Sequence, residues 1–189
     1  MRALYLRMPA VATLVLAVGA GYLIGGIRSA LVVCALTLFI AFSPWWDRAL
    51  VTLYMATFGV VISCLIGFTV GTLCFQNKKS AAFMLGICDI FQTFPSFVYL
   101  IPVMMLFGIT DTSVLIAVVV YATIPATRYT IEGLRSVPVG LHEAATMSGV
   151  NKFQRLTKIE FPLAFPHMML GLNQTIVFAL FMVIIGAFI

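Results

Sequence analysis

Charged side chains are scarce in this 189-residue sequence: Asp, Glu, Lys and Arg make up 9% of it, whereas hydrophobic residues make up 62%. Soluble domains contain roughly 25% charged residues. The scarcity excludes an ordinary soluble domain and indicates an integral membrane protein. The net charge is only +5, and no basic run alternates with aromatic residues, so we do not expect nucleic acid as a partner.

The sequence also lacks the patterns of common catalytic and metal sites. It has no GxxxxGK[ST] phosphate loop, so the chain is not itself an ATPase. Its four cysteines form no CxxC pair and its two histidines have no second ligand nearby, so neither a metal site nor a disulfide framework is indicated. The six acidic residues form no pair at catalytic spacing. We therefore expect no catalytic residue and no cofactor bound by this chain.

What the sequence does contain is a series of long apolar runs. A membrane-spanning helix needs about 20 apolar residues. Six runs meet this length roughly, at residues 8–26, 30–46, 50–75, 81–107, 113–126 and 164–189. Pro95 and Pro102 are each expected to kink or break the fourth helix, and Gly67 and Gly71 permit close packing of the third. The predicted fold class is an all-α membrane protein, a polytopic bundle of about six transmembrane helices.

One long polar interval, residues 138–162, predicts two short helices joined by a glycine. Pro138 suits a first helical turn, and Gly149 suits the left-handed position just after a helix end. Asn151 suits the cap of the second helix, which Pro162 is expected to end. By composition alone, a solvated loop that happens to be helical explains the interval equally well.

The distribution of basic residues orients the bundle, because cytoplasmic loops carry an excess of lysine and arginine. With the loop 128–163 inside, eight of the eleven basic residues are cytoplasmic and three are external. The eight are Arg28, Lys78, Lys79, Arg128, Arg135, Lys152, Arg155 and Lys158. The three are Arg2, Arg7 and Arg48. The inverted arrangement has the opposite ratio, so we expect loop 128–163 to be cytoplasmic.

Six positions of the polar interval resemble the cytoplasmic EAA loop of the membrane-spanning subunits of ABC-type importers. These positions are Glu143, Ala144, Ala145, Gly149, Ile159 and Pro162. Phe161 stands where that family usually has leucine. The resemblance implies a type I ABC importer permease fold, in which a coupling helix, here about residues 138–148, docks into a cleft on the ATP-hydrolysing subunit. It also implies that ATP and Mg²⁺ bind to that partner.

Residues 50–189 are further similar to the permeases for proline, glycine betaine and choline. The segments DIFQTFPSFVYLIPVMMLFGI, IPATRYTIEGLRSVP and FPLAFPHMMLGLNQT carry this similarity, whereas residues 1–49 contribute two spans and no motif. It implies import of an osmoprotectant such as glycine betaine, proline betaine or choline across the inner membrane of a prokaryote. It also implies an external substrate-binding protein, two ATP-binding cassette subunits and a second permease chain. Such permeases usually continue into one more helix, which we expect this chain to lack.

Polar residues inside the expected spans indicate a solute path. A carboxylate at mid-bilayer costs about 2.5–3.5 kcal/mol. Asp89 is therefore expected either to face protein or water, or to pair with a basic residue nearer the interface. The expected path consists of Asp89, Gln92, Thr93, Phe94, Pro95, Tyr99, Asn173 and Gln174.

Aromatic faces suit a quaternary ammonium. Phe91, Phe94, Phe97, Tyr99 and Tyr121 either supply such faces or pack the bundle and meet lipid.

Two other functions stay open at this point. The same machine would serve an amino acid, a sulfonate or another small solute equally well, because the motif concerns the motor and not the solute. The chain would also suit a membrane anchor or sensor that recruits a soluble partner and moves nothing.

Overall fold

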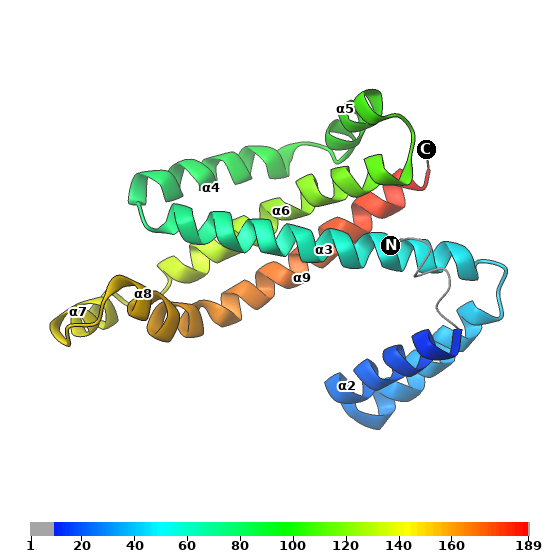
Figure 1. Cartoon of the computed structure of the whole chain (residues 1–189), viewed down its shortest axis with the longest axis horizontal. Helices are drawn as coiled ribbons and strands as arrows, with labels where there is room; N and C mark the ends of the chain where they lie inside the picture. The colour runs from blue at the N-terminus through cyan, green and yellow to red at the C-terminus, as the bar shows by residue number, and fades with distance from the viewer. Residues whose placement is uncertain (1–9, 189) are drawn as a thin grey trace. The chain divides into compact units, whose positions relative to one another are not determined.

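A computed structural model describes residues 10–188, except the side chains of residues 10, 11, 142 and 146. The described residues form helices joined by short turns and contain no strand (Figure 1), which confirms the all-α prediction. The chain divides into two compact units, Met1–Met55 and Ala56–Ile189, with the boundary inside helix α3 (Trp46–Phe75). The sequence-based boundary between residues 49 and 50 stays a prediction.

The first unit contains helix α2 (Ala10–Ala41), which two glycines divide into two arms. Gly25 has non-helical angles, and Gly26 has a φ of 68°, which favours glycine. A Cβ added at Gly21 would lie 3.1 Å from Val33 Cγ2, so the arms pack side by side. The break between the first two expected spans, 8–26 and 30–46, is therefore found at Gly25 and Gly26.

The second unit is built around helix α6, which lies among four other helices. α6 spans Asp111–Arg135, and its neighbours are α3, α4 (Lys78–Thr93), α5 (Phe97–Phe107) and α9 (Phe161–Gly186). α6 packs most extensively against α9 and also contacts α4 and α5. Ala117, Ala122 and Ile131 of α6 are fully buried. α6 is thus the element on which the site residues of its neighbours converge.

Small residues bring α3 and α6 together. A Cβ added at Gly67 would lie 2.4 Å from Ala126 Cβ, and one added at Gly71 would lie 2.6 Å from Thr130 Cβ. Ser63 Oγ donates a hydrogen bond across the same interface to the Val119 carbonyl oxygen, at 3.1 Å. Lipid is as apolar as leucine, so helices in a membrane associate through such close packing and polar contacts. The expected role of Gly67 and Gly71 is confirmed.

Of the two prolines expected to interrupt the fourth span, only Pro95 does so. The helices before and after it, α4 and α5, meet at 87°. Phe94 has an extended conformation, with a ψ of 137°, because the residue before a proline is pushed out of the helical region. Pro102 lies inside α5, which continues to Phe107. The loss of one hydrogen bond at Pro102 therefore does not break the helix.

The described residues contain four helices long and apolar enough to cross a membrane, or up to five if the bent pair α4–α5 counts as one span. The expected count of six is higher because it treats the two arms of α2 as separate spans. α6 also continues past the expected end at residue 126, since Pro125 is accommodated within it.

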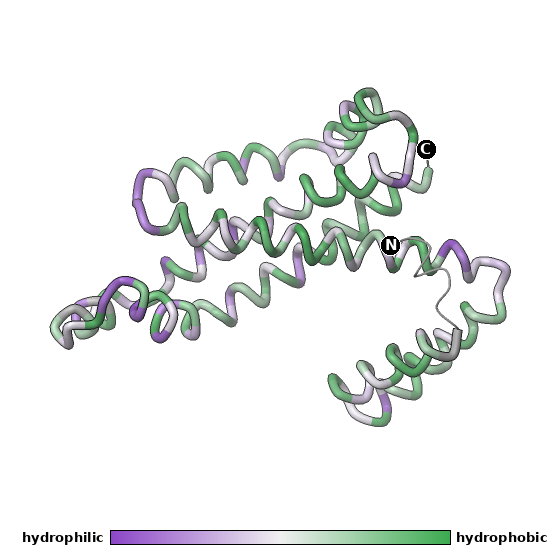
Figure 2. The backbone as a smooth tube through the Cα atoms, in the orientation of Figure 1, coloured by the Kyte–Doolittle hydropathy of each residue, from purple (hydrophilic) through white to green (hydrophobic). Residues whose placement is uncertain are grey.

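Arg128 therefore lies in a spanning helix and not in the loop. The count of eight to three depended on that loop boundary and on six alternating spans, so the cytoplasmic side of the loop stays a prediction. Arg2 and Arg7 of that count lie outside the described residues. Hydrophilic residues gather in the turn between α3 and α4 and in the polar loop (Figure 2). Arg135, at the end of α6, donates to the Lys78 carbonyl oxygen at 3.3 Å, so two of the basic segments lie close together.

Candidate functional site

The polar loop contains the two expected short helices, α7 (Val139–Met147) and α8 (Lys152–Arg155). Gly149 has a φ of 71° just after α7. The Val150 N–H donates to the Ala145 carbonyl oxygen at 3.1 Å, and the Ser148 N–H donates to the Ala144 carbonyl oxygen at 3.0 Å. This bond pattern with a left-handed glycine is a Schellman-type helix end. The expected position of Gly149 is confirmed.

The second helix begins with the expected asparagine cap. Asn151 Oδ1 accepts from the Gln154 N–H at 2.8 Å, and Gln154 Oε1 accepts in return from the Asn151 N–H at 3.2 Å. This reciprocal capping box satisfies two amide groups that a helix start leaves without intrahelical partners. Together with Gly149, it fixes where α7 ends and α8 begins.

The expectation that Pro162 ends the second helix is wrong. A π-helical turn, Leu156–Glu160, follows α8 and leads directly into α9. The Phe161 N–H donates to the Leu156 carbonyl oxygen, five residues back. Pro162 then lies in the first turn of α9, where its missing N–H removes little. The wide turn thus allows the chain to pass from the loop into the membrane without a break.

Four of the six motif residues meet around one cavity of about 530 Å³. Ala144 and Ala145 of α7 line it opposite Ile159 and Pro162. Ala145 is only 4% exposed, so the alanine face of α7 lies against the start of α9. Glu143 is exposed, and Val139 and Met147 of α7 are 69% and 92% exposed. The helix therefore leaves a partly apolar surface uncovered.

An ion pair that the sequence did not indicate spans the π-helical turn. Arg155 Nε lies 2.9 Å from Glu160 Oε1, and Glu160 is 2% exposed. These residues line a cavity of about 430 Å³ with Phe75 and Gln76 from the end of α3. Residues five apart do not face each other on a regular α-helix. Only the wider π turn brings this pair together, so a pattern search at α-helical spacing misses it.

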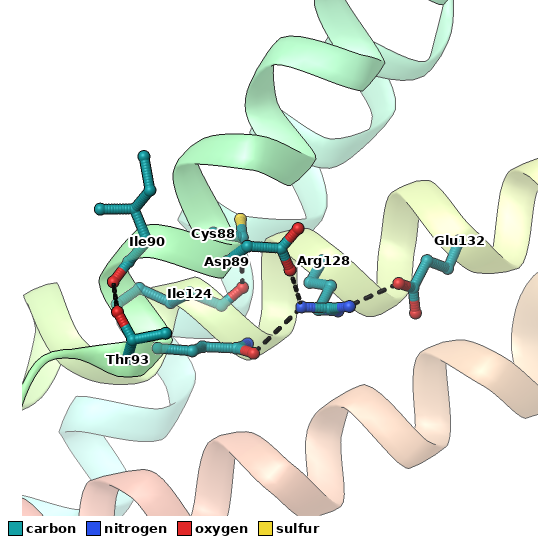
Figure 3. Close-up of polar contacts among 8 residues, drawn as sticks. Cys88, Asp89, Ile90, Thr93, Ile124, Arg128 and Glu132 are labelled. Carbon is teal, nitrogen blue, oxygen red and sulfur yellow. Dashed lines mark hydrogen bonds and ion pairs between the residues drawn. The ribbon is translucent and has the colours of Figure 1, made fainter.

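The second cluster of polar groups surrounds Arg128 of α6 (Figure 3). Arg128 forms an ion pair with Asp89 of α4 and donates to Gln92 Oε1 at 3.1 Å and to Glu132 Oε1 at 3.0 Å. Asp89 thus pairs with a basic residue, whereas its depth in the membrane stays a prediction. That partner is supplied by a neighbouring spanning helix.

A cavity of about 340 Å³ lies beside this cluster, between α4, α6 and α9. Its lining residues are Gln92, Pro125, Arg128, Tyr129, Glu132, Gln174 and Phe178. Two expected path residues, Gln92 and Gln174, thus meet although they are far apart in the sequence. Glu132, Arg128 and Phe178 were not among the expected path residues.

The remaining expected path residues lie elsewhere. Thr93 donates to the Ile90 carbonyl oxygen at 2.7 Å, a bond within its own helix. Phe94 and Pro95 are exposed at the bend between α4 and α5, and Asn173 is exposed on α9. Asn173 and Gln174 are adjacent in the sequence, and neighbouring residues of a helix point in different directions.

Aromatic rings connect the bend of α4–α5 to the cavity. The buried ring of Tyr99 lies 6.0 Å from that of Phe91 and 5.1 Å from that of Tyr121. Tyr121 stacks on Phe178 with their centroids 4.7 Å apart. Phe91 also makes an edge contact with Phe94, at 6.3 Å. Four of the five expected aromatic residues thus form one chain of rings, and that chain ends at a residue lining the cavity.

Known proteins are similar to this chain in sequence. Residues 59–189 match the family described as binding-protein-dependent transport system inner membrane component. The whole chain is 88% identical to the trimethylamine N-oxide transport system permease protein TmoV of Pelagibacter ubique, and 45% identical to the protein of the same name from Ruegeria pomeroyi. Over 76% of the chain, it is 37% identical to the glycine betaine/proline betaine transport system permease protein ProW of Escherichia coli. The chain spans 26%, 29% and 41% of these three relatives.

Proposed function

Because the chain belongs to the family of binding-protein-dependent transport system inner membrane components, we propose that it forms part of the permease of an ABC importer for small methylated ammonium compounds. The family match and the relatives confirm the expected resemblance to ABC importer permeases and the expected place in a prokaryotic inner membrane. The family is one of transport components and not of enzymes.

The names of the relatives support the proposed solute class. Relatives at 88% and 45% identity are named for trimethylamine N-oxide, and one at 37% is named for glycine betaine and proline betaine. These solutes share a nitrogen that carries methyl groups and a positive charge, together with an oxygen that carries negative charge. Of them, we propose trimethylamine N-oxide or a close analogue as the solute.

The geometry of the polar loop supports its proposed role as the contact for an ATP-hydrolysing partner. The alanine face of α7 lies against Ile159 and Pro162 of the same chain. The opposite surface, with Glu143 and Met147, is free of such packing and faces outward. α9 continues from α8 through the π turn, so a displacement of the loop would move α9 with it as a rigid body. ATP and Mg²⁺ would bind to the partner.

Two ATP-binding subunits, a second permease chain and an external substrate-binding protein complete the proposed assembly. The full-length protein is reconstituted with these partners in liposomes, and uptake of labelled trimethylamine N-oxide and ATP hydrolysis are measured. We expect the loaded binding protein to stimulate both. Competition with unlabelled glycine betaine, choline, a sulfonate and an amino acid identifies the solute class.

Charge reversal at the loop tests the proposed contact. Glu143→Lys should reduce stimulated hydrolysis and uptake to background without reducing membrane insertion. Asp47→Lys makes the same charge change outside the family match, and it should leave both activities unchanged. Wild-type uptake by the Glu143 variant would contradict the assignment of the loop. If the wild-type complex hydrolyses no ATP in response to the loaded binding protein, the alternative of an anchor or sensor is favoured.

A further inference from the structure

The cavity beside Arg128 offers groups of both charges to one small space. The guanidinium of Arg128 and the carboxylate of Glu132 line it together, with the amides of Gln92 and Gln174. Its volume of about 340 Å³ falls within the range of small-molecule sites, about 300–1,000 Å³. A purely apolar solute would form no hydrogen bond with these polar groups.

The rest of the lining is aromatic. Tyr129 and Phe178 both line the cavity, and Phe178 also stacks on Tyr121. Aromatic faces attract cations that are weakly hydrated, such as methylated ammonium groups. A guanidinium instead makes strong, charge-assisted hydrogen bonds with an anionic oxygen. The lining therefore has a partner for each end of a dipolar molecule.

We propose that this cavity binds the transported solute, with its anionic oxygen on Arg128 and its methylated ammonium against Tyr129 and Phe178. The inference rests on the transport function proposed above and assigns the solute a place on this chain. The solute class is a compact dipole: an N-oxide or a betaine. Arg128 distinguishes such a solute from a simple methylated cation, which has no group to accept its hydrogen bonds.

The Arg128 guanidinium also connects α6 to α4. In the structure, Arg128 donates to Gln92 of α4 and pairs with Asp89 of the same helix. Asp89 is not among the residues that line the cavity, and its side chain is 59% exposed. Arginine has five N–H donors, so a solute oxygen in the cavity shares the guanidinium with these α4 groups.

Binding to the permease itself tests the site. The full-length permease is purified with its ATP-binding subunits and without the binding protein, and it is titrated by equilibrium dialysis with three labelled compounds. These are trimethylamine N-oxide, glycine betaine and tetramethylammonium, which has methyl groups and a positive charge but no oxygen. We expect the wild type to bind the two dipolar compounds more tightly than tetramethylammonium.

Arg128→Gln should weaken binding of both dipolar compounds about tenfold or more, because a charge-assisted hydrogen bond is lost, and should not weaken binding of tetramethylammonium, because a repelling positive charge beside the cavity is removed. Arg128→Lys should restore part of the loss. Arg135→Gln is the matched control: it lies on the same helix, and its guanidinium donates to the Lys78 carbonyl oxygen and not into the cavity. It should bind all three compounds as the wild type does.

Phe178→Ala provides a second, independent variant should Arg128→Gln fail to fold. It should weaken all three compounds severalfold and keep the preference for dipoles. The site is refuted if the wild type binds no dipolar compound, if either cavity variant binds like the wild type, or if Arg128→Gln weakens all three compounds equally. Stimulated ATP hydrolysis by the wild-type complex is measured separately, and its absence would contradict the transport function whatever the dialysis gives.

Discussion

Replacement of Gly149 by valine measures how much one backbone conformation contributes to the stability of the polar loop. Gly149 has a φ of 71°, and a residue with a Cβ pays about 1–2 kcal/mol in this region, with β-branched residues the least tolerant. A Cβ at Gly149 would meet nothing within 4 Å among the described residues. The penalty in Gly149→Val therefore comes from the backbone and not from crowding.

A backbone penalty of about 1–2 kcal/mol is large for a helix as short as α7, which has nine residues. Helices shorter than about 12 residues are marginal on their own, and 1–2 kcal/mol changes an equilibrium about 5- to 30-fold. The amides of Ser148 and Val150 close the end of α7. We expect their hydrogen exchange to be about 5- to 30-fold faster than in the wild type, in proportion to the change in the folding equilibrium of α7. Stimulated ATP hydrolysis by the reconstituted complex should fall as the docked helix becomes less populated.

Gly140→Ala is the matched control within the same helix. A Cβ at Gly140 also meets nothing within 4 Å of the described residues, and its φ is not positive. Alanine should favour the helix by about 0.5–1 kcal/mol, so exchange should slow and hydrolysis should be unchanged. Wild-type exchange and hydrolysis in Gly149→Val would refute the reasoning, as would an equal loss of hydrolysis in Gly140→Ala.

Two further predictions concern packing and the π-helical turn. Gly71→Leu should destabilise the full-length protein by about 1–3 kcal/mol through overpacking against Thr130 and lower its thermal melting temperature; Gly86→Leu, with nothing within 4 Å of the described residues, should not. Arg155→Ala removes one partner of the buried Glu160 carboxylate and should cost about 1–3 kcal/mol in chemical denaturation, whereas Arg155→Lys should cost less. Equal melting temperatures for the two leucine variants, or an unchanged denaturation midpoint for Arg155→Ala, would contradict these assignments.

The sequence predicted the polar loop well because its signals are local. A left-handed glycine and an asparagine cap act within a few residues, and both Gly149 and Asn151 take the expected roles. Pro162 was misinterpreted because its effect depends on the preceding turn. In a regular α-helix it would disrupt hydrogen bonding, but the π turn places it at the start of α9.

The polar cavity was predicted only in part, since its residues meet through tertiary packing. Gln92 and Gln174 were expected because amides are conspicuous in apolar spans, and both line the cavity. Arg128 was missed as a cavity residue because its span was expected to end at residue 126, which placed Arg128 in the loop 128–163. Phe178 could not be distinguished from the many other phenylalanines, because a helix that is apolar all round shows no preferred face.

Site-specific cross-linking at α7 tests the central claim, that this loop contacts an ATP-hydrolysing subunit, most directly. Met147 is 92% exposed on α7, and Phe83 is 71% exposed on α4. Each is replaced by cysteine in a full-length protein that lacks other thiols, and the assembled complex is treated with a short thiol-to-amine cross-linker. The account predicts a cross-link from residue 147 to the ATP-binding subunit and none from residue 83. A complex that forms without a cross-link from residue 147, or with equal cross-linking from both residues, would contradict it.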